Sequence, residues 1–382
     1  MQTSTKNIPS TGLLTVDLKA LVANWTLLRE IMCRVNSSAI CAAVVKADAY
    51  GLGADQVVKA LWLAGCRVFF VATVSEAIVV RKSLGNEAVI VVFGGISHGL
   101  GNEWLQYSLT PMLFQKEHIT RWLNYSVAKA KKLPYAIKID TGMHRLGLSL
   151  SEFREACVEI KNRRWHEPWL VMSHLACADD PGHPLNHCQL KEFTEAVSLA
   201  NAKFSNTCYS LVNSSGLFLG EPFLFDLGRP GVALYGANPT PWKQNPMNNV
   251  VKLQVPIMQV KTISVDEGVG YGMSFIAKRV TRIAIVFGGY ADGLLRALNY
   301  SGFAYCSGVK VPLVGRISMD SMIFDVTDIQ GEISPVIDVL GEEQSIDDLA
   351  KYAGTIPYEL LTSLGDRYKR VYVPVERDSC YE

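Results

Sequence analysis

One lysine stands at the end of an apolar run, and its position suggests nucleophilic chemistry. The segment 40–53, ICAAVVKADAYGLG, passes through apolar residues to Lys46 and then enters a small, glycine-rich loop that carries Tyr50. Loss of hydration at the end of a buried strand disfavours an ammonium ion and lowers the pKa of a lysine. Such a lysine can act as a nucleophile or form a Schiff base. The alternative is a strand residue whose side chain simply reaches water.

Further polar residues stand next to other apolar runs. They are Lys138 and Arg145 in KIDTGMHRLG, His174 in SHLA, Asn213 and Ser214 in NSSG, and Arg229 and Gly231 in GRPG. The hydroxyl of Ser214 and the absence of a side chain at Gly231 suit an anion such as a phosphate. A Schiff-base lysine with a phosphate site is what pyridoxal phosphate requires. A phosphosugar enzyme of the aldolase kind would show the same two features.

The elements that must position these residues alternate through the first two thirds of the chain. Apolar, β-branched runs predict strands at 39–46, 69–73, 88–93, 109–113, 134–140, 168–174, 208–213 and 231–235. Amphipathic spacing predicts helices at 55–64, 75–83, 118–131, 150–162 and 186–202. This alternation predicts a (β/α)8 TIM-type barrel, in which active sites lie at the C-terminal ends of the strands. The polar residues above follow or flank those ends.

A Pro- and Asn-rich linker at 239–249 separates the barrel from a different second domain. Closely spaced Val- and Ile-rich runs at 253–263, 281–287, 309–314 and 321–326 predict a mostly antiparallel β domain. Helices are expected at 345–353, where SIDD supplies an N-cap, and around 357–364. We therefore expect a barrel over 1–244 and a C-terminal β domain over 245–382.

Composition argues against several classes of protein. The 37 Lys and Arg balance 36 Asp and Glu, which argues against a general nucleic-acid or membrane-surface binder. The N-terminal MQTSTKNIPSTG lacks the apolar core of a signal peptide, and no apolar stretch reaches transmembrane length. The nine scattered cysteines form no CxxC pair, as is typical of a reducing compartment. We expect a cytoplasmic protein with no metal, nucleic-acid or membrane partner.

The longer motifs resemble those of the alanine racemase family. VVKADAYGLG, KIDTGMHRLG, SHLA, NSSG, GRPGVALYG, VGYG, GGYADG and VGRISMD follow that family's order and spacing over about residues 11–372. The resemblance implies a pyridoxal 5′-phosphate-dependent isomerase that interconverts L- and D-alanine and supplies D-alanine for peptidoglycan. It also implies a head-to-tail homodimer, in which the β domain of one subunit contributes to the active site of the other.

The same resemblance assigns roles to individual residues. Lys46 would hold the cofactor as a Schiff base and act as a base on one face of the substrate, and the partner's Tyr271, which His174 would contact, would act on the opposite face. The expected cofactor-binding residues are Lys46, Tyr50, His174, Asn213, Ser214, Arg229, Gly231, Val232 and Tyr358. The expected substrate-binding residues are Arg145 and Met319, with Lys138, Tyr290 and Asp320 in support.

Three of these positions carry a more specific expectation. Arg229 would face the pyridine nitrogen, and because a guanidinium does not readily give up a proton, it would keep the ring a weak electron sink. Lys138 matches a lysine that in some members carries a carbamate bound to Arg145, and an unmodified amine is the alternative. Asp320 would join the hydrogen-bond network at the entrance, or would serve only as a turn residue.

Three other functions share this barrel. A broad-specificity amino-acid racemase is usually exported, so the missing signal peptide counts against it. VGYG and GRISMD favour a racemase over a basic amino-acid decarboxylase. A non-catalytic cofactor carrier would lack the β domain and Tyr271.

Two departures from the family are Ser318, where some members have cysteine, and the ending ELLTSLGDRYKRVY. Serine is expected as a slow substrate, since a pocket discriminates by only about 1–3 kcal/mol per methylene.

Overall fold

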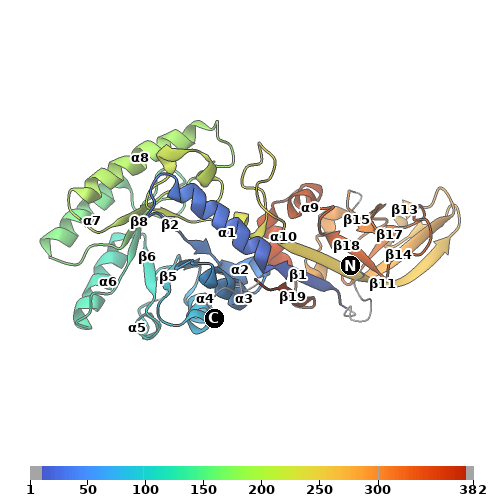
Figure 1. Ribbon diagram of the computed structural model, residues 1–382, viewed down its shortest axis with the longest axis horizontal. Coiled ribbons are helices and arrows are strands. Elements are labelled where there is room, and N and C mark those ends of the chain that lie inside the picture. Colours follow the sequence, from blue (N-terminus) through green and yellow to red (C-terminus); the bar gives the residue numbers. More distant parts are fainter. Residues whose placement is uncertain (1–10, 98, 300, 376–382) are drawn as a thin grey trace, which may run out of the picture.

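The computed structural model describes residues 11–97, 99–299 and 301–375, which form a barrel and a β domain (Figure 1). In Figure 1 the barrel, with α6, α7 and α8 on its outside, occupies one end of the long axis, and the β domain around β11, β14 and β17 occupies the other. Most of the N-terminal segment considered for a signal peptide, and Cys380, lie outside the described residues.

Seven parallel strands form most of the barrel. In spatial order they are β3 (Ala43–Val44), β4 (Val68–Val71), β5 (Val89–Val92), β6 (Thr110–Leu113), β7 (Ala136–Lys138), β8 (Leu170–Met172) and β9 (Cys208–Ser210). A separate parallel pair, β10 (Leu227–Gly228) with β2 (Ile40–Cys41), completes the ring. Arg229 N–H donates to Val212 O at 3.1 Å, so the ring closes between β9 and β10. The predicted barrel is confirmed.

The eighth strand lies earlier in the chain than expected. The prediction of a strand at 231–235 is wrong, because Val232–Tyr235 forms a 3-10 helix, η4, and the strand is β10. Pro230 lacks an N–H, and a proline ends strand pairing. The backbone of Gly231 then turns with φ −126° and ψ −89° to begin η4. A strand of two residues is too short to show any periodicity.

The barrel helices cover the outside of the strands. They are α1 (Leu18–Cys33), α3 (Ala54–Leu63), α4 (Val74–Leu84), α5 (Glu103–Gln106), α6 (Lys116–Ala128), α7 (Leu150–Asn162) and α8 (Pro184–Asn201). Capping boxes begin α4, through Thr73 and Glu76, and α7, through Ser149 and Glu152. Five of these helices lie close to their predicted ranges. α1, which was not predicted from the sequence, buries Trp25 against the barrel.

The β domain is built on an eight-stranded sheet that recruits both ends of the described chain. Its strands are β1 (Leu13–Asp17), β11 (Val251–Ile263), β14 (Thr281–Phe287), β15 (Phe303–Cys306), β16 (Val309–Pro312), β17 (Ser321–Asp325), β18 (Val336–Leu340) and β19 (Lys369–Val373). β1 pairs antiparallel with β11 and parallel with β19. The first strand of the described residues therefore belongs to this sheet rather than to the barrel, an arrangement that no sequence pattern predicted.

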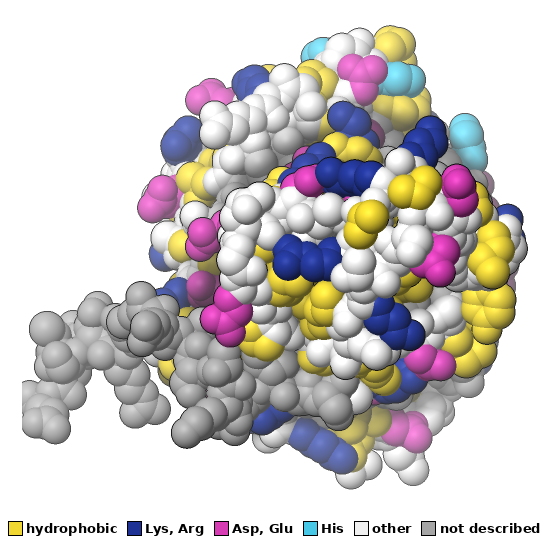
Figure 2. Space-filling view, turned by 90° about the vertical axis from the view of Figure 1, so that its right-hand side faces the viewer, with side chains coloured by type: hydrophobic (Ala, Val, Ile, Leu, Met, Phe, Trp, Pro, Cys, Tyr) yellow, Lys and Arg dark blue, Asp and Glu magenta, His cyan; other side chains and the backbone are white. Residues whose placement is uncertain are grey.

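Smaller elements complete the β domain. A short hairpin of β12 (Gly268–Val269) and β13 (Phe275–Ile276) encloses η5 (Tyr271–Met273), and η6 (Tyr290–Asp292) follows β14. α9 (Ile346–Ala353) begins at the expected Ser345 cap, and α10 (Pro357–Ser363) follows it. Figure 2 views the molecule from the end of the β domain and shows basic and acidic side chains interspersed on that face. None of the described helices combines the length and apolarity needed to cross a bilayer.

Candidate active site

Lys46 begins a left-handed turn, a conformation that non-glycine residues rarely adopt. In the short element α2 (Lys46–Gly51), the four residues after Lys46 have φ between 52° and 59°. A left-handed conformation costs roughly 1–2 kcal/mol for each such residue. Backbone strain of this kind persists only where the surroundings impose it, and it clusters at functional sites. The turn leaves Lys46 exposed at the C-terminal end of β3 and buries Tyr50.

Two carboxylates tie this turn to the helices around it. Ala47 N–H donates to Glu76 Oε1 at 3.0 Å, and the same carboxylate caps α4 through its other oxygen. Ala54 N–H, at the start of α3, donates to Asp48 Oδ1 at 2.7 Å. The strained backbone is thus fixed by side-chain acceptors from within the barrel.

Five nitrogen-bearing side chains influence one another electrostatically around the turn. They are Lys46, Lys138, Arg145, His174 and Arg229. Partial burial and the charge of Arg145 lower the pKa of Lys46. Burial, Arg145 and Arg229 lower the pKa of Lys138 to about 8. Enclosure of the ring, and then Arg229 and Lys138, lower the pKa of His174 well below its ordinary value, so its imidazole is neutral at pH 7. So much positive charge favours an anionic ligand.

Arg229 is buried and held in a fixed orientation. Its Nη1 donates to Ser210 Oγ, and its Nη2 donates to Ser173 O at 2.6 Å and to Leu211 O at 3.3 Å. Burial lowers the pKa of Arg229 to about 9, which still leaves it protonated at neutral pH. The guanidinium therefore presents a positive charge with a defined direction to the interior of the barrel mouth.

A buried chain of neutral polar groups continues from Arg229 to helix α8. Ser173 and Thr141 join through their hydroxyls at 2.7 Å, and Gln189 Nε2 donates to Thr141 Oγ1 at 3.2 Å and to His174 O at 2.9 Å. Ser173, Thr141 and Gln189 are each at most 2% exposed. A fully satisfied buried network holds its members in place, so this one orients both Arg229 and His174.

A cradle of small and hydroxyl-bearing residues lies beside the turn. Ser214 Oγ accepts hydrogen bonds from Gly231 N–H at 2.9 Å and Ala233 N–H at 3.3 Å. A Cβ at Gly231 would lie 2.3 Å from Tyr50 Oη, so only glycine leaves this space open. The rings of Tyr50 and Tyr358 are 6.0 Å apart, and burial raises both pKa values, that of Tyr358 to about 12. Both phenols stay protonated and can donate to an anion.

The two remaining barrel residues border the cradle. Asn213 Oδ1 accepts from Gly216 N–H at 2.9 Å and so shapes the loop that carries Ser214, and Val232 begins η4. The lysine, the buried arginine and the open cradle together fit a cofactor with an aldehyde, a ring nitrogen and a phosphate. The structure thus groups the barrel residues expected from the sequence, and Tyr358 of α10 joins them.

The expected residues of the β domain lie elsewhere. Figure 1 shows β13, the strand next to Tyr271, at the far end of the β domain from α2, so one protomer does not bring Tyr271 to its own Lys46. Tyr271 is 73% exposed, and Met319 and Tyr290 are also exposed. Further exposed apolar side chains of this domain are Met258, Val260, Val265, Met273, Ile276 and Val280. Such exposure is typical of a protein interaction surface.

Asp320 has a structural partner within the β domain. Arg367 donates from Nε and Nη2 to the two oxygens of the buried Asp292, at 2.6 and 2.9 Å, and from Nη1 to Asp320 Oδ1 at 2.7 Å. Tyr290 N–H donates to the carbonyl of Ser318 at 3.1 Å, beside Met319. Arg367 therefore ties the segment that carries Met319 to the turn that carries Tyr290.

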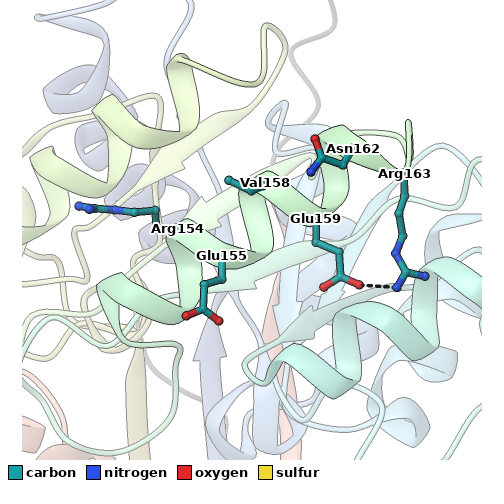
Figure 3. A pocket seen from close by; sticks show the side chains of 6 residues that line it. All are labelled: Arg154, Glu155, Val158, Glu159, Asn162 and Arg163. Atoms are coloured by element: carbon teal, nitrogen blue, oxygen red, sulfur yellow. Dashed lines mark ion pairs between the residues drawn. The ribbon is translucent and has the colours of Figure 1, made fainter.

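A separate hollow lies on the outside of the barrel along α7. Figure 3 shows its lining side chains on successive turns of that helix, where Arg163 pairs with Glu159 at 3.1 Å. The side chains that line it are Arg154, Glu155, Val158, Glu159, Asn162 and Arg163. Most are charged groups on an exposed helix face, and none belongs to the set around Lys46.

Sequence reasoning missed the residues that support the site. These are Glu76, Thr141, Ser173, Gln189, Ser210 and Arg367. Only Glu76 leaves a signal, because a threonine three positions before a glutamate is typical of a capping box. That signal predicts the helix cap but not the second contact to the turn.

Comparison with known proteins finds similar sequences over nearly the whole chain. The family models for the alanine racemase N-terminal and C-terminal domains match residues 16–239 and 250–372. The alanine racemase of Rhodospirillum rubrum is 44% identical over 373 residues, which cover 97% of this chain and 98% of that protein. A catabolic and a biosynthetic alanine racemase of Agrobacterium fabrum are 42% and 41% identical, over 95% and 94% of this chain and 92% and 93% of theirs.

Solved structures show the same fold. Alanine racemase from Bartonella henselae, with covalently bound pyridoxal phosphate, superimposes with a TM-score of 0.88 at 38% identity, covering 96% of this chain and 100% of that one. The enzyme from Streptomyces lavendulae has a TM-score of 0.88 at 28% identity, covering 97% and 99%. These similarities extend through both the barrel and the β domain.

Proposed function

Given that this chain belongs to the alanine racemase family and interconverts L- and D-alanine with pyridoxal 5′-phosphate, we propose that each active site combines Lys46 of one protomer with Tyr271 of a second copy. Pyridoxal phosphate withdraws electrons from the α-carbon of a bound amino acid and so makes its α-proton acidic. Racemisation then needs one group to remove that proton and a second to return one from the opposite face.

Lys46 holds the cofactor through its amino group and serves one face. A lysine must be unprotonated to act as a nucleophile or a base. Partial burial and the charge of Arg145 both lower the pKa of Lys46, which raises the fraction of free amine. The left-handed turn fixes the start of its side chain, since the backbone on its C-terminal side is held by Glu76 and Asp48.

Tyr271 of the second copy serves the opposite face. A tyrosine removes a proton only as its phenolate, so a neighbouring acceptor must first take the phenol proton. The neutral imidazole of His174 is such an acceptor. Support for this assignment is the 73% exposure of Tyr271 at the end of the β domain, which leaves it available to another protomer.

The remaining residues bind and orient. Ser214, Gly231, Val232, Tyr50 and Tyr358 hold the phosphate, with Asn213 shaping their loop. Arg229 donates a hydrogen bond to the ring nitrogen and does not protonate it, because its pKa of about 9 keeps its own proton at neutral pH. Because the pyridine ring then stays unprotonated, it withdraws electrons less strongly, which limits side reactions.

The substrate carboxylate lies against positive charge. Arg145 binds it, the partner's Met319 adds its backbone N–H, and Lys138 adds a second positive charge beside Arg145. Tyr290 and Asp320 line the entrance, where Arg367 fixes Asp320. A site crowded by Tyr271, Tyr358 and Met319 favours a one-carbon side chain.

One observation carries the proposal: a lysine of lowered pKa stands on a strained turn next to an open cradle of hydroxyl groups. The test follows L-alanine by circular dichroism with cofactor-loaded protein and with Lys46→Ala. We expect the signal to decay to zero only with intact Lys46. Persistence of the signal with the unchanged protein, although cofactor is bound, would overturn the assignment and redirect the search to serine, lysine or arginine.

The physiological setting is part of the proposal. We place the enzyme in the cytoplasm, supported by the eight described cysteines, each of which is a free thiol. We assign it the supply of D-alanine for peptidoglycan, although its relatives include both biosynthetic and catabolic enzymes. Deletion of its gene in a host with no other alanine racemase is expected to make growth depend on added D-alanine, and growth without it would contradict that role.

A further inference from the structure

The strained turn at Lys46 is also held from outside the barrel. Four of its non-glycine residues have positive φ. The free-energy cost of that conformation must be offset by contacts that would be lost if the backbone relaxed. Glu76 and Asp48 account for the first half of the turn. The carbonyl groups at the end of the turn, those of Gly51 and Leu52, accept hydrogen bonds from a different element.

That element is β19, the last strand of the β domain among the described residues. Arg370 donates from Nε and Nη2 to Gly51 O at 3.1 and 3.0 Å. Tyr372 Oη donates to Leu52 O at 3.0 Å. These residues lie more than 300 positions from the turn in sequence, so the contacts join the two domains.

Two glycines permit this close approach. Gly51 has φ +82°, and a Cβ there would lie 2.6 Å from Leu361 O of α10. Gly53 has φ +95°, and a Cβ there would lie 2.1 Å from Tyr372 Oη. A side chain at Gly51 would collide with the backbone of α10, and a side chain at Gly53 would displace the Tyr372 hydroxyl from the turn.

We propose that Arg370 and Tyr372 are positioning residues that hold the Lys46 turn in its left-handed form from the β domain. The inference rests on the proposed roles of Lys46 and Tyr50. β19 pairs with β1, and β1 pairs with β11, the long strand that leads toward Tyr271. The sheet that contains β19 therefore fixes the lysine of its own barrel and, through β11, leads into the separate β12–β13 hairpin that carries the tyrosine offered to the other protomer.

The physical consequence concerns cofactor retention more than overall stability. Loss of the hydrogen bonds from Arg370 and Tyr372 leaves the carbonyl groups of Gly51 and Leu52 without these donors and allows the turn to relax. Relaxation moves Lys46, which holds the cofactor, and Tyr50, which contacts its phosphate. Because a net hydrogen bond contributes only about 1 kcal/mol, we expect about three- to tenfold faster cofactor release from each variant.

The test uses the cofactor-loaded enzyme with Tyr372→Phe and Arg370→Lys. Matched controls break the same kinds of bond elsewhere: Tyr135→Phe removes a hydroxyl that donates to His166 O at 2.8 Å, and Arg282→Lys alters an arginine that donates to Val326 O and Ile329 O. For each protein we would measure the thermal midpoint, cofactor release by visible absorbance, and amide hydrogen exchange across 46–53.

We expect all four variants to lower the thermal midpoint by similar amounts. Only Arg370→Lys and Tyr372→Phe should also speed cofactor release and amide exchange across 46–53. Cofactor release and amide exchange equal to those of the matched controls would overturn the positioning role of Arg370 and Tyr372. If the unchanged enzyme showed no Lys46-dependent cofactor absorbance, the proposed function itself would fail, which separates the two failures.

Discussion

Lys138 is buried beside Arg145 and Arg229, and the cost of that position depends on pH. Its pKa is lowered from 10.5 to about 8, so between these values the unfolded chain binds more protons than the folded one. Stability therefore falls as pH drops from 10.5 to 8 and then levels off. Lys138→Met should stabilise the fold at pH 7 by up to about 3 kcal/mol, and most of this gain should vanish by pH 10.

Denaturant unfolding at pH 7 and pH 10 checks this prediction, with Lys131→Met, an exposed lysine beyond α6, as the control. The control should change stability little at either pH. An equal gain at both pH values, or no gain at pH 7 because Lys138 carries a carbamate, would contradict the account of a free buried amine.

Gly231 is a residue at which a single methyl group would fill the phosphate cradle. The added Cβ of Gly231→Ala would lie 2.3 Å from Tyr50 Oη, so the phenol must move. Cofactor affinity is expected to fall at least about tenfold, since a displaced phenol loses its charge-assisted hydrogen bond. Gly182→Ala is the control, because a Cβ there meets nothing closer than 3.5 Å. Equal cofactor affinity in both variants, measured by absorbance titration, would remove Gly231 from the cradle.

At the scale of elements, α4 and α7 offer a natural comparison. Both begin with a capping box, formed by Glu76 in one and Glu152 in the other, but only Glu76 also accepts from the N–H of Ala47. Replacement by glutamine leaves one acceptor oxygen where the carboxylate had two. We expect Glu76→Gln and Glu152→Gln to destabilise by a similar amount, about 1 kcal/mol.

Only Glu76→Gln should also change the turn that it contacts. We expect faster amide exchange across 46–53 and weaker cofactor retention in that variant, whereas Glu152→Gln should match the unchanged protein in both. Identical exchange in the two variants would show that the helix cap is the whole role of Glu76.

The elements also show where sequence patterns stop being informative. Strand–helix alternation predicts the barrel because each strand or helix shows its own spacing of apolar residues in the local sequence. Polar residues at the ends of the predicted strands single out Lys46 and Arg229. The two-residue β10 carries no period, and β1 joins a sheet whose other strands lie more than 200 residues later. Supporting residues such as Gln189 and Arg370 act through contacts between distant segments. Those contacts depend on the closed fold, so no local pattern predicts them.

At the scale of the whole molecule, the described chain divides the expected catalytic set between its two ends. Lys46 and Arg229 both lie near His174 at the barrel mouth, and Tyr358 packs against Tyr50 of the Lys46 turn, whereas Tyr271 is exposed in the hairpin that contains β13, at the other end of the molecule. A single protomer would then be incomplete. We expect specific activity to fall as the enzyme is diluted below its dimer dissociation constant, with the monomer content followed by light scattering. Full specific activity in a solution of monomers would contradict a shared site.

The most direct test of the shared site mixes two inactive variants. Lys46→Ala and Tyr271→Ala should each be inactive alone. In a mixed dimer, one site would combine both altered residues and the other would combine the intact Lys46 of one chain with the intact Tyr271 of the other. Co-expression of the two variants in equal amounts should therefore restore about a quarter of the unaltered activity, because half of the dimers are mixed and each has one intact site. Mixed dimers, isolated by two different tags, that racemise alanine no faster than either variant alone would contradict the account.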